Sequence, residues 1–197
     1  LDAMVAVSID GRSVWIRPWL YVHTCPHGHR VPILLMDTDL DQNSSEDRTL
    51  THYLYGGDDA YRLKQEIVLG VGGTRLLRAL GFDVHTYHLN EVHAALLTLD
   101  LMERYRLSAE DIEPGQPPYE IAEIRERCVF TTHTPIEAGH DRFSYDLFNR
   151  LLPDFPAIED LKHFAGRVQL NVTQLALNLS GYINGVARRH AETTKHM

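Results

Sequence analysis

A change of hydrophobic period near residue 60 limits most strongly how this 197-residue chain can fold. Before that point, apolar residues come in short, β-rich runs. The runs 5–9 and 13–17 flank Asp10-Gly11-Arg12, and Asp-Gly between two such runs predicts a β-hairpin. The apolar run 31–36 predicts a third strand, buried on both faces. We therefore expect residues 1–36 to be mainly β-strand and the polar segment 37–60 to be a loop.

After Tyr61, helical stripes alternate with short strand-like runs. The first helix should end at Gly81, a residue typical of helix C-termini, and its buried side should carry Leu63, Ile67, Leu69, Gly73, Leu76 and Leu80. A strand is expected at 84–89, followed by a helix with Val92, Ala95, Leu99 and Met102 on one stripe. Further expected elements are helices at 119–127, 144–152, 170–179 and from 187 onward, and a strand at 128–132.

This alternation predicts an α/β fold with a mostly parallel sheet flanked by helices. Residues 1–197 should form a single partial domain, in which 61–197 supply the alternating helices and strands. The chain starts with Leu1, almost inside a strand-like pattern, so we expect it to be a fragment of a longer protein.

Composition narrows the possible functions. The net charge of −8 argues against a nucleic-acid binder, which would normally carry a basic stripe. The sequence has no apolar run of membrane-spanning length and no visible secretion signal. Cys25 and Cys128 are far apart in different contexts, so no structural disulfide is expected and a cytoplasmic location is the default.

Polar side chains follow two of the expected strands. Asn90, Glu91 and His93 follow the first, and the second is followed by His133, Thr134, Glu137, His140 and Asp141. Ligands of open α/β sheets bind beyond the carboxyl ends of the strands, so parallel neighbouring strands would bring the two groups into one crevice. A purely structural interpretation stays open, because Asn90 could cap the next helix and His133 could be a turn residue. The residues predict a cleft for a polar ligand without selecting which one.

Several motifs, in order, resemble those of the α-glucan phosphorylases. The main ones are Tyr61-Arg62-Leu63-Lys64-Gln65-Glu66, His88-Leu89-Asn90-Glu91-Val92-His93-Ala94-Ala95 and Cys128-Val129-Phe130-Thr131-Thr132-His133-Thr134-Pro135. Shorter matches occur around Gly57, Gly72, Asp141 and Asn184, so the likeness runs from about Val31 to the C-terminus. The resemblance implies a piece of the Rossmann-like N-terminal domain of a two-domain enzyme of the GT-B type.

The resemblance also implies an activity and a cofactor. Enzymes of this family use inorganic phosphate to cleave the terminal α-1,4 bond of a glucan and release glucose 1-phosphate, and they are often homodimers. Their pyridoxal phosphate is bound by a lysine of the C-terminal domain, outside this segment. We therefore expect the parent protein to be a phosphorylase and the isolated chain to be inactive. The alternatives are a GT-B glycosyltransferase that uses a sugar nucleotide and a non-catalytic glucan-binding domain.

Site residues follow from the same resemblance. His133 would contact the glucosyl unit, with Asn90, Glu91, His93 and Thr134 lining or supporting the pocket and Glu91 orienting a neighbouring imidazole. Asn184 and Val186 would approach the sugar from a later loop, while the ion pairing of Arg62, Lys64 and Glu66 would be structural. Val92 replaces a family glycine, which leaves the conformation of this turn open because a β-branched residue does not readily take a positive φ.

Two other patterns resemble a metal site and a nucleotide-binding loop, but a structural interpretation fits each better. His23, Cys25, His27 and His29 alternate like metal ligands on one face of a strand, but Pro26 and Gly28 favour a polar turn over a metal site. Gly70-Val71-Gly72-Gly73 lies inside a helical stripe rather than between a strand and a helix, so it predicts close packing and not a dinucleotide loop.

Overall fold

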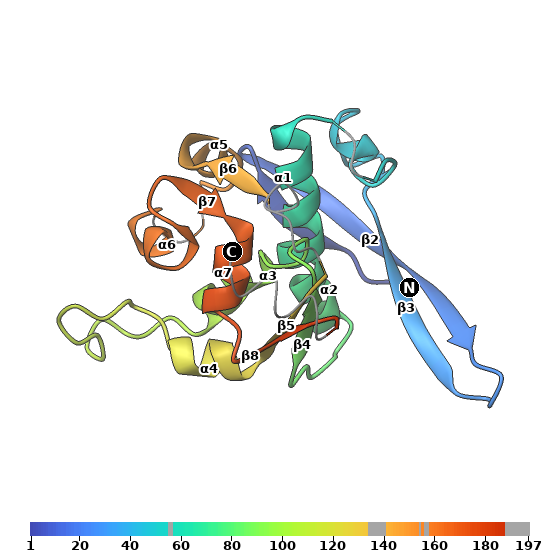
Figure 1. Ribbon diagram of the computed structural model, residues 1–197. Helices are drawn as coiled ribbons and strands as arrows, with labels where there is room; N and C mark the ends of the chain where they lie inside the picture. The colour runs from blue at the N-terminus through green and yellow to red at the C-terminus, as the bar shows by residue number, and fades with distance from the viewer. Residues whose placement is uncertain (55–56, 134–140, 154, 156–157, 188–197) are drawn as a thin grey trace.

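The computed structural model describes residues 1–54, 57–133, 141–153, 155 and 158–187. An α/β body is joined to an antiparallel sheet whose outer half projects away from it (Figure 1). The strands are β1 (Val5–Ile9), β2 (Arg12–Thr24), β3 (Arg30–Asp37), β4 (Tyr87–Asn90), β5 (Cys128–Thr132), β6 (Arg142–Ser144), β7 (Gln169–Asn171) and β8 (Tyr182–Gly185). The α-helices are α1 (Asp59–Ile67), α2 (Gly73–Ala79), α3 (Leu97–Arg104), α4 (Ile121–Glu126), α5 (Tyr145–Leu151), α6 (Ile158–Ala165) and α7 (Val172–Asn178).

The N-terminal hairpin is confirmed. β1 and β2 pair antiparallel, with Ile9 opposite Arg12. Asp10 and Gly11, which connect them, both have positive φ, 55° and 70°, as a two-residue type I′ turn requires. Strand alternation then places Val7, Ile9, Val14 and Ile16 on the buried face, where they join the core of the body.

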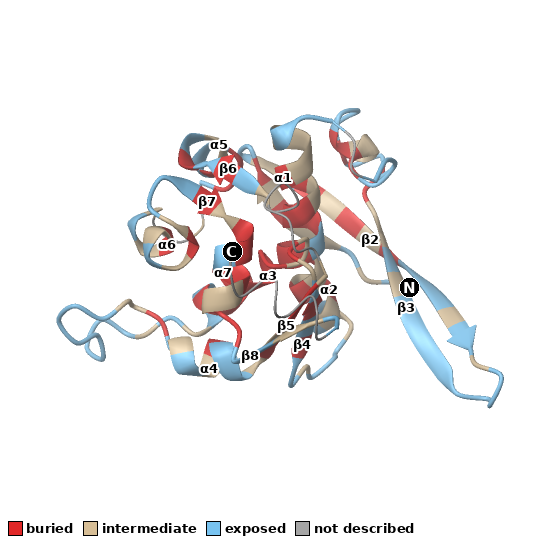
Figure 2. Ribbon diagram, in the orientation of Figure 1, coloured by how far each residue is buried: buried red, intermediate tan, exposed pale blue. Residues whose placement is uncertain are grey.

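The third strand is confirmed, but the prediction that it is buried on both faces is wrong. β3 pairs antiparallel with the outer half of β2, and together residues 17–37 form a projecting ribbon that is mostly exposed (Figure 2). Trp19 is 52% exposed and Leu35, opposite it, is 54% exposed. An apolar run does not reveal whether anything covers it, and no described helix does so here.

One long helical segment, not a single regular α-helix, follows the loop. α1 begins at Asp59, where the Asp58 side chain accepts a hydrogen bond from the Tyr61 amide, and it passes through a π-helix, η2 (Val68–Gly72), into α2. The wider π-helical turns bring Val68 and Val71 into the core, so the expectation that Leu69 is buried is wrong. Gly81, with φ 79°, ends the segment as expected.

The glycines in η2 allow close packing, as predicted. A Cβ on Gly70 would lie 2.7 Å from the Leu97 amide nitrogen, and one on Gly72 would collide with Ile16. The helical segment therefore lies directly against both α3 and the hairpin, which holds the antiparallel sheet to the α/β body.

The predicted parallel sheet exists, in the order β4-β5-β8. Leu89 pairs with Phe130, and Phe130 with Ile183, in parallel register. Helices α3, α4 and α7 pack around this sheet, and α5 and α6 lie beside the small antiparallel pair β6 and β7 (Figure 1). Val92, Ala95, Leu99 and Met102 are all buried as expected, although α3 begins only at Leu97.

The sequence reasoning missed β6, β7, β8 and α6, whose short runs carry little periodic signal. The helix expected from 187 onward lies outside the described residues except for Ala187. Cys25 and Cys128 are both free thiols, and burial raises the pKa of Cys128 to about 12. No helix in the described part of the chain is long and apolar enough to cross a membrane.

Candidate active site

The two polar strand ends meet, as the parallel pairing of β4 with β5 requires. His133, just after β5, places its Nε2 2.7 Å from the Asn90 Oδ1 at the end of β4. The neighbouring Glu91 carboxylate accepts a hydrogen bond from the backbone N–H of His133. Asn90 therefore fixes the imidazole, and Glu91 fixes the backbone that carries it. The expectation that Glu91 orients a neighbouring imidazole stays a prediction; at His133 the Glu91 carboxylate meets the backbone and Asn90 meets the ring.

The tautomer of His133 follows from this contact. Because the Asn90 amide oxygen can only accept, the Nε2 of the imidazole must carry the proton. In the neutral ring, Nδ1 is then the acceptor. An imidazole held in this way at the carboxyl edge of a parallel sheet is suited to contact a hydroxyl group.

A hydrogen-bonded chain crosses the same sheet toward β8. The Thr131 hydroxyl donates to the Asn184 Oδ1 at 2.8 Å and contacts His88 Nε2 at 2.7 Å. Val186 reaches the sheet edge through its backbone N–H, which donates to the Thr132 carbonyl at 3.0 Å. Asn184 and Val186 thus approach from a third parallel strand and its end, not from a loop alone. Thr131 was missed, because a buried threonine in a β-rich run carries no local signal of function.

The turn after β4 adopts an unusual backbone conformation at Glu91 and not at Val92. Glu91 has φ 65°, and its N–H donates to the Thr131 carbonyl at 3.0 Å. Val92 is buried in the core and avoids positive φ. Replacement of the family glycine by valine is therefore compatible with this turn.

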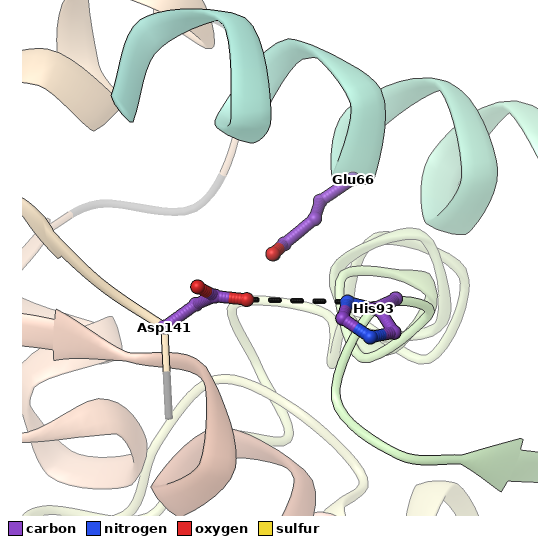
Figure 3. A group of neighbouring side chains, drawn as sticks. All are labelled: Glu66, His93 and Asp141. Carbon is purple, nitrogen blue, oxygen red and sulfur yellow. Dashed lines mark ion pairs between the residues drawn. The ribbon is translucent and has the colours of Figure 1, made fainter. Parts of the chain in front are cut away.

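His93 belongs to a second cluster, in which it meets Glu66 and Asp141 (Figure 3). One ligand atom from each of these three side chains lies within 4.8 Å of the other two. The His93 Nδ1 is 3.9 Å from the Asp141 Oδ2, and the Arg62 Nη2 binds the Asp141 Oδ1 at 2.5 Å. Burial, together with the facing Asp141 carboxylate, raises the pKa of Glu66 to about 9. Arg62 and Glu66 were expected to be structural, and Asp141 is the partner that joins them.

A cavity of about 570 Å³ opens beside this second cluster. Its polar lining includes Arg62, Glu66 and His93, and its apolar lining includes Met36 and Leu69. His133 and Asn90 do not line it. The two clusters are therefore separate parts of one region, linked by the short turn from Asn90 to His93.

Some predicted residues fall elsewhere. Thr134, Glu137 and His140 lie outside the described residues. His23, Cys25, His27 and His29 occupy the β2–β3 connection, where the Gly28 N–H donates to the Cys25 carbonyl in a tight turn. Among the described residues, only Glu66, His93 and Asp141 bring three His, Cys, Asp or Glu ligand atoms together. The four side chains of the 23–29 turn do not form such a group, in keeping with the polar turn that the sequence favoured.

Comparison with known proteins shows which proteins this chain is similar to. The chain is 38% identical to the maltodextrin phosphorylase of Thermococcus litoralis over 98% of its own length and 34% identical to the glycogen phosphorylase of Mycobacterium tuberculosis over 85%. It is 26% identical to the glycogen phosphorylase of Aquifex aeolicus over 96%. The chain is homologous to a segment of the α-glucan phosphorylases. It spans 23%, 21% and 29% of the lengths of these relatives. No family model matches the chain.

The phosphorylase homology extends over the antiparallel ribbon as well as the α/β body, since the Thermococcus litoralis match covers nearly the whole chain. The motif resemblance was strongest in α1, in the turn after β4 and in β5, and these are the elements that supply Arg62, Asn90 and His133. Family resemblance and geometry therefore select the same region of the molecule.

Proposed function

We propose that this chain forms one wall of the glucan-binding cleft of an α-glucan phosphorylase, with His133 as the residue that contacts the terminal glucosyl unit. The proposed reaction is phosphorolysis of a terminal α-1,4-glucosidic bond, which yields glucose 1-phosphate. The names of the homologues support this reaction over transfer from a sugar nucleotide. The observation that carries the assignment is the His133 imidazole, held by Asn90 at the meeting point of two parallel strands.

The side chains of this wall would bind and orient sugar hydroxyls. With Nε2 committed to Asn90, the His133 Nδ1 would accept a hydrogen bond from a hydroxyl of the sugar. Glu91 would act as a positioning residue through the His133 backbone, and Asn184 through Thr131. Their contribution is to keep the imidazole and the sheet edge in one arrangement before the sugar arrives.

The cofactor belongs to the same proposal. Pyridoxal phosphate in this family supplies a phosphate group that works with inorganic phosphate. Lys64 is bound by Glu46 at 2.5 Å and Lys162 by Glu159 at 2.8 Å, so the described lysines do not fit an imine-forming role. We therefore assign the cofactor to the rest of a GT-B type phosphorylase. Lys195 lies outside the described residues.

Binding of maltoheptaose, measured by calorimetry, tests whether His133 contacts the glucan. We expect the chain to bind the sugar and His133→Ala to weaken binding by about 10-fold, the effect of one lost hydrogen bond of roughly 1.4 kcal/mol. His85→Ala is the matched control, because His85 is exposed and its ion-pair partner, Asp83, is also at the surface. Equal affinity of the His133→Ala variant and the parent chain would count against the assignment.

An activity assay separates the two remaining alternatives. With pyridoxal phosphate and inorganic phosphate added, we expect the isolated chain to release no glucose 1-phosphate from maltoheptaose. Release of glucose 1-phosphate would show that the isolated chain does not need the domain proposed to bind the cofactor. Turnover of a sugar nucleotide by the isolated chain would instead favour the glycosyltransferase alternative.

A further inference from the structure

A partly buried group of metal-ligating side chains lies outside the proposed sugar contact. Glu66 comes from α1, His93 from the turn after β4, and Asp141 from the residue before β6 (Figure 3). Three elements that are distant in sequence thus direct a carboxylate, an imidazole and a second carboxylate toward one point. Their ligand atoms lie within 4.8 Å of one another, so small rotations of the side chains would bring all three to the distance of about 2.0–2.2 Å from a single ion at which zinc ligands lie.

Unsatisfied oxygen atoms point to a missing ligand at this point. Glu66 is only 4% exposed, and neither its Oε2 nor the Asp141 Oδ2 has a hydrogen-bond partner among the described residues. Buried carboxylate oxygens are normally hydrogen-bonded or bound to a cation, because leaving them without a partner is unfavourable. Figure 3 shows the Glu66 carboxylate directed at the space between Asp141 and His93.

Arg62 supports the arrangement without filling it. Its Nη2 binds the Asp141 Oδ1 at 2.5 Å, which fixes the carboxylate with its other oxygen, Oδ2, on the side of His93. Hydrogen bonds of this kind commonly orient carboxylate ligands around metal ions. The cavity lined by Arg62, Glu66 and His93 provides an entry path.

We propose that Glu66, His93 and Asp141 bind one divalent transition-metal cation, of the zinc or cobalt type. Two carboxylates with one imidazole suit these ions, whereas magnesium and calcium favour sets made of oxygen alone. Nothing in this proposal depends on phosphorylase activity or on sugar binding. It assigns to the chain a metal site beside the sugar contact and separate from it.

Titration of the metal-free, untagged chain with Co²⁺ tests the proposal. We expect one equivalent to bind and to give visible d–d absorption without the intense near-ultraviolet band of a cobalt–thiolate bond. Glu66→Gln and Asp141→Asn, which keep side-chain shape and remove a ligand charge, should each weaken Co²⁺ binding by at least about 10-fold. Circular dichroism would establish that each variant is folded. One folded variant with weakened Co²⁺ binding is enough to support the proposal.

The β2–β3 turn supplies the matched control, because it holds the other histidines and the cysteine that could capture cobalt. A double variant, Cys25→Ser with His27→Gln, should leave the affinity and the spectrum unchanged. The proposal is overturned if the parent chain binds no Co²⁺, if a thiolate band appears, or if the turn variant loses binding while Glu66→Gln and Asp141→Asn retain it.

Discussion

At the scale of single residues, Asp47 is the clearest buried charge outside the site. It is 2% exposed and accepts hydrogen bonds from Arg12 at 3.2 Å and from the Ser44 hydroxyl at 2.7 Å. Burial disfavours the charged carboxylate, but the hydrogen bonds from Arg12 and Ser44 outweigh it and lower the pKa of Asp47. Through these contacts the carboxylate joins the hairpin to the loop that precedes α1.

Asp47→Asn should therefore lower the free energy of unfolding by about 1–3 kcal/mol at pH 7, as expected when a buried charged hydrogen bond is broken. The folded-state pKa of Asp47 is below the unfolded value of about 3.9, so its stabilisation is complete above that value and is lost as the pH falls through the folded pKa. Urea unfolding at pH 7 and pH 3 should show the difference between parent and variant shrinking in acid.

Asp10→Asn is the control for this prediction. Asp10 binds the same arginine at 3.1 Å but is largely exposed, and asparagine tolerates its positive φ. Its effect should stay below about 0.5 kcal/mol at both pH values. A loss for Asp10→Asn equal to that for Asp47→Asn would mean that burial of the carboxylate is not the cause.

At the scale of elements, the close approach of η2 to α3 depends on Gly70. Alanine there would place its Cβ 2.7 Å from the Leu97 nitrogen and 2.9 Å from the Leu96 carbonyl carbon, and backbone atoms cannot move aside cheaply. We expect Gly70→Ala to destabilise the chain by about 1–3 kcal/mol, despite the better helix propensity of alanine. Denaturant unfolding measures this change.

Gly73→Ala is the matched substitution in the first turn of α2. Its Cβ would meet only the Met36 sulfur, at 3.9 Å, so we expect no loss and a gain of up to about 1 kcal/mol from helix propensity. If both alanines had the same effect, helix propensity and not the contact with α3 would determine the result.

The elements that the sequence predicted share a strong local signal. Asp10-Gly11 specifies its own turn, and Cys128–Thr132 is a β-rich run whose bounds the structure reproduces. The π-helix was not predictable from a period of 3.6, because it depends on how η2 fits against α3. β8 was missed because its four residues become a strand only by pairing with β5.

The candidate site likewise has a part that the sequence predicted and a part that it did not. Asn90, Glu91 and His133 could be predicted because they follow consecutive parallel strands, and the geometry of the sheet brings strand ends together. The Glu66 cluster joins residues up to 75 positions apart through helix packing, which no local pattern encodes. Sequence therefore located the sheet edge, and only the folded chain showed that His93 turns toward Asp141.

At the scale of the whole molecule, one face of the β2–β3 ribbon is left uncovered. Strand register places Trp19, Tyr21, Val31, Ile33 and Leu35 on this face, and all five are exposed. Together they present on the order of 500 Å² of apolar surface, against about 800 Å² per partner in a standard protein interface. The charged residues at the inner end of this face, Arg17 and Asp37, pair with each other at 3.2 Å, and the Arg17 guanidinium stacks on Trp19.

We therefore expect the isolated chain to self-associate through this face at concentrations on the order of 10–100 μM, because the surface is sizeable but below that of a stable dimer. Replacing the cross-strand pair with Tyr21→Thr and Ile33→Thr keeps β-propensity and removes apolar area, so it should shift sedimentation toward the monomer. Val168→Thr is the control, because Val168 is 88% exposed and lies outside the ribbon. An equal shift in the control, or a monomeric parent chain across this range, would show that the ribbon face does not drive association.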